Sequence, residues 1–116
     1  GHGFGTEATV FVDRYFFFAG GLPENSYIGL LLQLGFAGLF SFVAVFALWL
    51  VVGARAWLIA EPDMRLALSA CAAALVSALL MATVQSYFYS VGNIATLGLW
   101  LSGFLLITAA AQVRRA

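Results

Sequence analysis

Residues 27–52 read YIGLLLQLGFAGLFSFVAVFALWLVV and contain no charged side chain. As a helix, this stretch would reach roughly 39 Å, because an α-helix rises about 1.5 Å per residue. The hydrocarbon core of a bilayer is about 30 Å thick, so the stretch can cross it with some tilt. We therefore predict a first transmembrane helix over residues 27–52, in which Gln33 is the most polar side chain.

Two further stretches, residues 66–88 and 94–113, are also free of charged side chains and long enough to cross a bilayer. Residues 89–93 lie between them and include Gly92 and Asn93, which favour tight turns. We predict a second and a third transmembrane helix over these stretches. The short outer turn should join them into an antiparallel hairpin.

The composition of the whole chain agrees with a lipid environment. Of its 116 residues, 64% are hydrophobic and 9% are charged, and the mean hydropathy is +1.03. A soluble domain is nearer half apolar and a quarter charged, so a helical bundle in water would lack the polar residues to cover its surface. The five basic residues form no basic stripe, which argues against nucleic acid as a partner. We predict an all-α membrane protein whose three transmembrane helices follow an extracytoplasmic loop segment.

The arginines predict the orientation of the three spans. The loop of residues 53–65 and the tail of residues 114–116 lie on the same side of the membrane if three helices cross it. Four of the five arginines belong to these two segments: Arg55, Arg65, Arg114 and Arg115. Arginine is enriched in cytoplasmic loops, so we assign this side to the cytoplasm and residues 1–26 to the opposite side.

Small residues recur along the second and third predicted spans. Such residues let helices approach closely in lipid, so we expect the second span to be the most tightly packed of the three. Its two rows are Ala70, Ala74, Ala78 and Ala82, and beside them Ser69, Ala73 and Ser77. The third span offers Gly98, Ser102 and Gly103 as a comparable face.

The first 26 residues hold most of the groups that could do chemistry. They begin GHGFGTE, whose spacing fits neither a dinucleotide fingerprint nor a phosphate-binding P-loop, and which a flexible turn would also explain. His2, the single histidine, is either a loop residue or a base. Arg14 follows Asp13 within an aromatic stretch. It is either a solvated charge at the membrane surface or an anion clamp for a phosphate.

Residues 20–27, GGLPENSY, lead into the first predicted span. Asn25 or Ser26 can cap the helix, because their side-chain oxygens accept hydrogen bonds from its first free N–H groups. Glu24 suits the positive end of the helix dipole. A carboxylate at this position could also serve as a general base.

Three pieces of the sequence resemble a known family. They are GHGFGT at residues 1–6, ENSY at residues 24–27 and LLLQLGFAGL at residues 30–39. In this order they resemble the O-antigen ligase and O-antigen polymerase family of bacterial membrane glycosyltransferases. Family ligases often have histidine where this chain has Glu24. This difference from the ligases permits a polymerase-like function or another acceptor.

The resemblance implies a multi-pass protein of the bacterial inner membrane. Such enzymes transfer a glycan from an undecaprenyl pyrophosphate carrier to an acceptor hydroxyl on the periplasmic side, with no bound metal or other cofactor. The chain would be the carboxy-terminal portion of its parent. Its partners would be the lipid bilayer, the carrier-linked glycan and the remaining helices of the parent protein.

The same resemblance suggests roles for particular residues. Arg14 would neutralise charge on the diphosphate leaving group and Glu24 would act as the base. The expected substrate-binding residues are Asn25, Tyr27, His2, Gly3 and Gly5. The alternative is a non-enzymatic helical membrane subunit or a transporter fragment. A transporter usually carries ionisable residues inside its spans, and the three predicted spans contain none.

Overall fold

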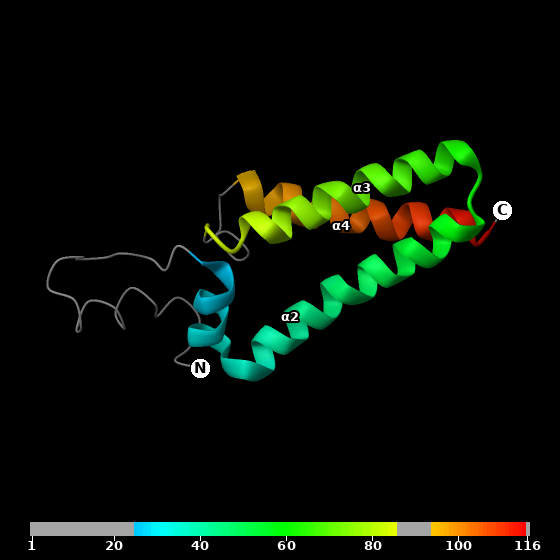
Figure 1. Cartoon of the computed structure of the whole chain (residues 1–116). Helices are drawn as coiled ribbons and strands as arrows, with labels where there is room; N and C mark the ends of the chain where they lie inside the picture. The colour runs from blue at the N-terminus through cyan, green and yellow to red at the C-terminus, as the bar shows by residue number, and fades with distance from the viewer. Residues whose placement is uncertain (1–24, 86–93, 116) are drawn as a thin grey trace, which may run out of the picture.

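The computed structural model describes residues 25–85 and 94–115. These residues form three helices: α2 (Ser26–Ile59), α3 (Pro62–Met81) and α4 (Ile94–Val113) (Figure 1). All three are long and apolar enough to cross a membrane, which confirms the predicted all-α class. The protein is thus a small helical membrane protein with three candidate spans, and residues 1–24 lie outside the described part.

The helices do not all begin and end where the predicted spans do. Helix α2 continues past Val52 to Ile59, and α3 begins at Pro62. Proline disfavours a helical conformation in the residue before it, and Glu61 is accordingly extended, with ψ of 157°. The corner between α2 and α3 is therefore two residues long, Ala60 and Glu61. Helix α4 covers residues 94–113, the range predicted for the third span.

The α-helical part of α3 ends at Met81, within the predicted second span of residues 66–88. The N–H groups of Thr83 and Val84 bond to carbonyl oxygens three residues back, on Leu80 and Met81. The Thr83 hydroxyl group also donates to the Leu80 carbonyl oxygen, at 2.7 Å. These bonds tighten the chain into a turn at the end of the helix. Residues 86–93 lie outside the described part.

Helix α2 is broken near its beginning. Gly35 has φ of 68° and ψ of −168°, a backbone conformation that is essentially restricted to glycine. The break turns a short first segment, residues 26–34, away from the long second segment (Figure 1). Just beyond the break, a Cβ atom on Gly38 would collide with the side chain of Leu34. The sequence pattern had indicated one uninterrupted helix, and this break is the main departure from it.

Helices α2 and α4 pack through two reciprocal contacts between a large and a small residue. The ring of Trp49 on α2 lies against Gly103 on α4, with no room for a Cβ atom between them. One turn further along, Leu106 on α4 lies against Gly53 on α2, where a Cβ atom would lie 2.8 Å from Cδ1 of Leu106. Close packing of this kind stabilises helix pairs in lipid.

An aromatic cluster surrounds the contact of Trp49 with Gly103. The Trp100 ring lies 5.9 Å from Trp49 and 5.5 Å from Phe46, measured between centroids, and Phe104 lies 5.3 Å from Trp49. Edge-on and tilted pairs at these distances are favourable. The cluster joins the middle of α2 to α4, while α4 also packs along α3.

The prediction that the second span is the most tightly packed helix is wrong. Its fully buried residues are the large Leu68 and Leu75, and α4 buries more residues than α3 does. Much of the small-residue face is exposed, whereas Ala78 is half-buried and Ala82 is buried. The exposed members of the two predicted rows are Ser69, Ala70, Ala73, Ala74 and Ser77. On α4, Ser102 and Gly103 are buried as predicted, whereas Gly98 is exposed.

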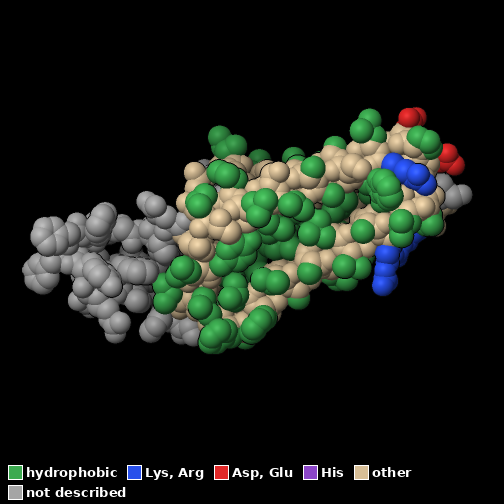
Figure 2. Space-filling model, in the orientation of Figure 1, with side chains coloured by type: hydrophobic (Ala, Val, Ile, Leu, Met, Phe, Trp, Pro, Cys, Tyr) green, Lys and Arg blue, Asp and Glu red, His purple; other side chains and the backbone are tan. Residues whose placement is uncertain are grey.

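The surface of the three helices is largely apolar (Figure 2). Large exposed side chains occur on every helix, among them Phe36, Leu48, Leu66 and Leu97, each more than half exposed. Exposed apolar area on this scale is unfavourable in water, and the helices therefore contact lipid. The described charged side chains gather at the end where α2 meets α3 (Figure 2).

Candidate functional site

The beginning of α2 is attached to the end of α3 by three successive residues. Asn25, Ser26 and Tyr27 donate four hydrogen bonds to backbone carbonyl oxygens 52 to 59 residues further along the chain. Their acceptors are the carbonyl oxygens of Leu79, Ala82, Thr83 and Gln85. The last carbonyl groups of a helix have no partner within it. Here Leu79, in the last turn of α3, and three residues just beyond its end receive partners from the beginning of α2. We call it the polar junction.

Asn25 uses both ends of its side chain. Its Oδ1 atom accepts from the backbone N–H groups of Tyr27, at 2.9 Å, and Ile28, at 3.1 Å, which makes Asn25 the N-cap of α2. Its Nδ2 atom donates to the carbonyl oxygen of Thr83, at 2.9 Å. The prediction that Asn25 or Ser26 caps the helix is therefore confirmed for Asn25.

Ser26 and Tyr27 complete the polar junction. The Ser26 backbone N–H donates to the Ala82 carbonyl oxygen at 2.9 Å, and its hydroxyl group donates to the Gln85 carbonyl oxygen at 2.7 Å. The Tyr27 hydroxyl group donates to the Leu79 carbonyl oxygen at 2.8 Å. Ser26 is fully buried, so its two bonds are shielded from competing water, whereas Tyr27 is half-buried.

Two of the predicted site residues, Asn25 and Tyr27, belong to this junction. The structure gives both a helix-anchoring role, and their predicted contact with a substrate remains a prediction. The other predicted site residues lie outside the described residues: His2, Gly3, Gly5, Arg14 and Glu24. Glu24 directly precedes Asn25 in the chain, so the junction fixes the residue next to the predicted base.

An apolar groove, which no sequence pattern had indicated, lies between α2 and α3. One part of it, about 490 Å³, is lined by Leu50, Gly53, Ala54, Leu58, Leu68 and Ala72, together with Trp57 and Ser69. A second part, about 250 Å³, lies nearer the polar junction and is lined by Tyr27, Phe42, Val43, Phe46, Ala47, Leu50 and Leu79. Leu50 lines both parts, which places them next to each other along α2. We call the larger part the lipid-facing groove.

Arg65, at the start of α3, holds the corner at the other end of the bundle. Its Nε atom donates to the Ala60 carbonyl oxygen at 2.8 Å, and its Cζ atom lies 5.2 Å from the ring centroid of Trp57. The indole N–H of Trp57 donates to the Ser69 hydroxyl oxygen at 3.1 Å. Arg65 therefore stabilises the end of α2 by a hydrogen bond and a cation–π contact. In the sequence, Arg65 served only to predict the orientation of the three spans in the membrane.

Within the described ranges no group of three or more histidine, cysteine or carboxylate side chains is arranged to hold a metal ion. Comparisons with protein-family models, curated proteins and solved structures find no match to this chain.

Proposed function

We propose that the chain is the carboxy-terminal membrane part of an O-antigen ligase-like or polymerase-like glycosyltransferase. In this proposal the parent enzyme lies in the bacterial inner membrane. It transfers a glycan from an undecaprenyl pyrophosphate carrier to an acceptor hydroxyl group on the periplasmic side. The described helices would anchor and position the catalytic segment of residues 1–24.

The polar junction is the observation that carries this proposal. It fixes Asn25 and Tyr27, two residues of the ENSY piece, at the end of the bundle opposite the corner that holds Arg65. The chain has no aspartate, glutamate, arginine or histidine in residues 66–85 and 94–113. Proton transfer and charge neutralisation would then depend on the segment that precedes the junction.

The chemistry assigns separate roles to two residues of that segment. The diphosphate leaving group gains negative charge as its bond to the glycan breaks, and a guanidinium such as that of Arg14 can stabilise it through paired hydrogen bonds. The acceptor hydroxyl group loses a proton as it attacks, and the Glu24 carboxylate can accept that proton. Asn25, by capping α2, would hold the neighbouring Glu24 at a constant position relative to the helix.

The test uses the full-length parent protein in its own membrane. We expect Arg14→Ala and Glu24→Gln each to reduce glycan transfer by at least about a hundredfold, the usual scale for one acid–base or charge-stabilising group. Membrane levels of the protein should be unchanged. Matched controls are Arg114→Ala and Glu61→Gln, which remove the same charges outside the proposed catalytic segment. Full transfer activity in both test variants would refute the residue assignment.

A second candidate, a transporter fragment, is favoured by the break at Gly35. Broken helices often line the substrate sites of transporters, where they expose backbone groups at the middle of the membrane. Gln33, just before the break, is 2% exposed. Uptake or efflux that depends on the parent gene and is abolished by Gly35→Ala, with glycan transfer intact, would favour this candidate over the glycosyltransferase.

A further inference from the structure

We propose that the end of the bundle containing Arg55 and Arg65 binds one anionic phospholipid. Its phosphate-bearing headgroup would contact these arginines, and one acyl chain would lie in the lipid-facing groove between α2 and α3. This proposal concerns the end of the bundle opposite the polar junction and does not depend on the proposed glycosyltransferase activity.

The groove has the character that an acyl chain needs. Six of its eight lining residues carry an aliphatic side chain or none, and its volume of about 490 Å³ falls within the usual range of small-molecule sites. Helices α2 and α3 approach at the Ala60–Glu61 corner and diverge from it along α2 (Figure 1). The groove therefore runs along the helices, in the direction that the chains of a bilayer lipid take.

Arg65 provides the charge at the edge of this groove. It contacts two of the lining residues, by stacking on Trp57 and by a long bond of 3.5 Å from Nη2 to the Leu58 carbonyl oxygen. A guanidinium has five N–H donors, and Arg65 gives one to Ala60 and one to Leu58. Within residues 25–85 and 94–115, no carboxylate forms an ion pair with Arg65. Its remaining donors can therefore bind a phosphate.

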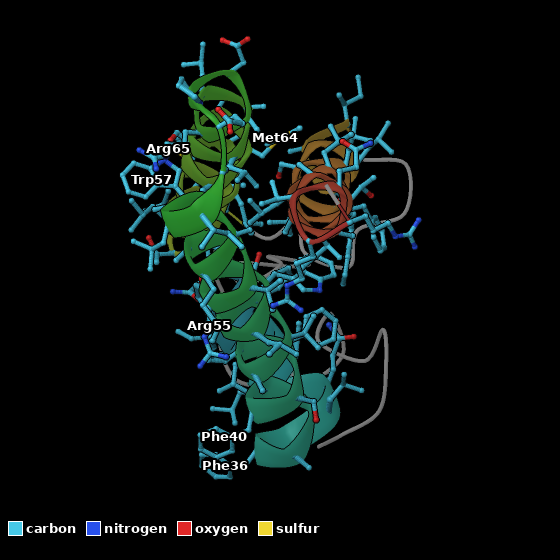
Figure 3. All side chains as sticks on the ribbon, turned by 90° about the vertical axis from the view of Figure 1, so that its right-hand side faces the viewer. Phe36, Phe40, Arg55, Trp57, Met64 and Arg65 are labelled. Atoms are coloured by element: carbon cyan, nitrogen blue, oxygen red, sulfur yellow. The ribbon has the colours of Figure 1, made fainter. Side chains whose placement is uncertain are left out.

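Arg55 adds a second positive charge on the same side. It directly follows the lining residue Ala54 and is exposed. Figure 3 shows Arg55, Trp57 and Arg65 on one side of the helix pair. Ser69 contributes a polar group inside the groove, since its hydroxyl oxygen accepts from Trp57 and its own O–H can donate to an ester oxygen of the lipid. The site thus offers positive charge, a polar donor and an apolar groove, which suit the headgroup, the ester groups and an acyl chain of a phospholipid.

The experiment uses quenching of Trp57 fluorescence by lipids with brominated acyl chains. The full chain is reconstituted into phosphatidylcholine vesicles with increasing fractions of brominated phosphatidylglycerol, or of brominated phosphatidylcholine as the neutral lipid. The difference between the protein and its Trp57→Phe variant isolates the Trp57 signal from that of Trp49 and Trp100. We expect the anionic lipid to bind roughly 25-fold more tightly than the neutral one, since each of the two arginines contributes about fivefold near a membrane surface.

Variants separate the headgroup contact from the acyl-chain contact. Arg55→Gln leaves the hydrogen bonds of the corner intact and should reduce the preference for the anionic lipid about fivefold. Arg65→Lys should retain more of this preference than Arg65→Gln. Arg115→Gln is the control, because it removes the same charge at a position outside the proposed site. Ala54→Phe, which fills the groove, should reduce quenching by both lipids. Its control is Ala74→Phe, on an exposed position of α3 outside the lining residues.

Two results would overturn the proposal. One is equal quenching by the anionic and the neutral lipid in the unaltered protein. The other comes from native mass spectrometry. It is a dimer, or a complex with another protein chain, that retains no phosphatidylglycerol and is lost in Ala54→Phe. The groove would then be an interface between helices.

Discussion

The indole ring of Trp49 lies against Gly103, so that α2 and α4 approach each other at a point where no larger residue fits. Leu106 and Gly53 make the reverse arrangement one turn further along. Lipid is as apolar as a leucine side chain, so helices in a membrane associate mainly through close packing of this kind. The contact between α2 and α4 should therefore depend strongly on the two glycines.

We predict that Gly103→Ala destabilises the protein by about 1–3 kcal/mol, the usual cost of overpacking a filled site. The added methyl group would displace the Trp49 ring and disturb the aromatic cluster around it. The matched control is Gly98→Ala on the same helix, because a Cβ atom at Gly98 meets nothing within 4 Å. Unfolding by SDS in mixed micelles measures both free energies, and equal values for the two variants would contradict this packing.

Gly35→Ala should straighten α2 or destabilise it. Alanine at φ of 68° and ψ of −168° costs about 1–3 kcal/mol, which a regular helical conformation would relieve. Spin labels at the exposed Ile28 and Val45, in a Cys71→Ala background, report the bend. A straight helix would separate the two backbone positions by roughly 26 Å, so we expect a shorter distance in the unaltered protein and a longer one in Gly35→Ala. An unchanged distance would show that glycine is not required at the break.

Tyr27→Phe should weaken the polar junction without altering its packing. The substitution removes the hydroxyl group that donates to the Leu79 carbonyl oxygen, and hydrogen bonds between membrane helices contribute about 0.6 kcal/mol on average. Ser41→Ala is a suitable control, because the Ser41 hydroxyl group bonds to Ala37 within the same helix. Faster amide hydrogen exchange near Ala82 is expected in Tyr27→Phe alone. Equal exchange in the two variants would argue against the junction.

The sequence predicted the features that depend on composition and on local chemistry. Three long apolar stretches specify three helices, because a backbone in hydrocarbon must satisfy its hydrogen bonds internally. Asn25 was recognisable as an N-cap because its side chain bonds to N–H groups two and three residues away. Buried Ser102 and Gly103 also follow the predicted small face of α4.

Features that depend on distant partners could not be predicted in this way. Gly35, Gly38 and Gly53 all look alike in an apolar stretch, yet only the first has a positive φ among the described residues. The Ala70–Ala74 face of α3 resembles a packing face, but it is exposed, and the buried residues of α3 are Leu68 and Leu75. The same holds for the candidate sites, since the acceptors of the polar junction are backbone carbonyl oxygens, which carry no signal in the sequence.

If α2, α3 and α4 each cross the membrane, as we predict, the two ends of the chain lie on opposite sides of it. Single cysteines at Glu24 and Arg115, in a Cys71→Ala background, can be tested with a membrane-impermeant maleimide on right-side-out bacterial membrane vesicles. We predict that the cysteine at position 24 is labelled in intact vesicles and that the cysteine at position 115 is labelled after permeabilisation. Labelling of both cysteines in intact vesicles, or of neither, would contradict three crossings.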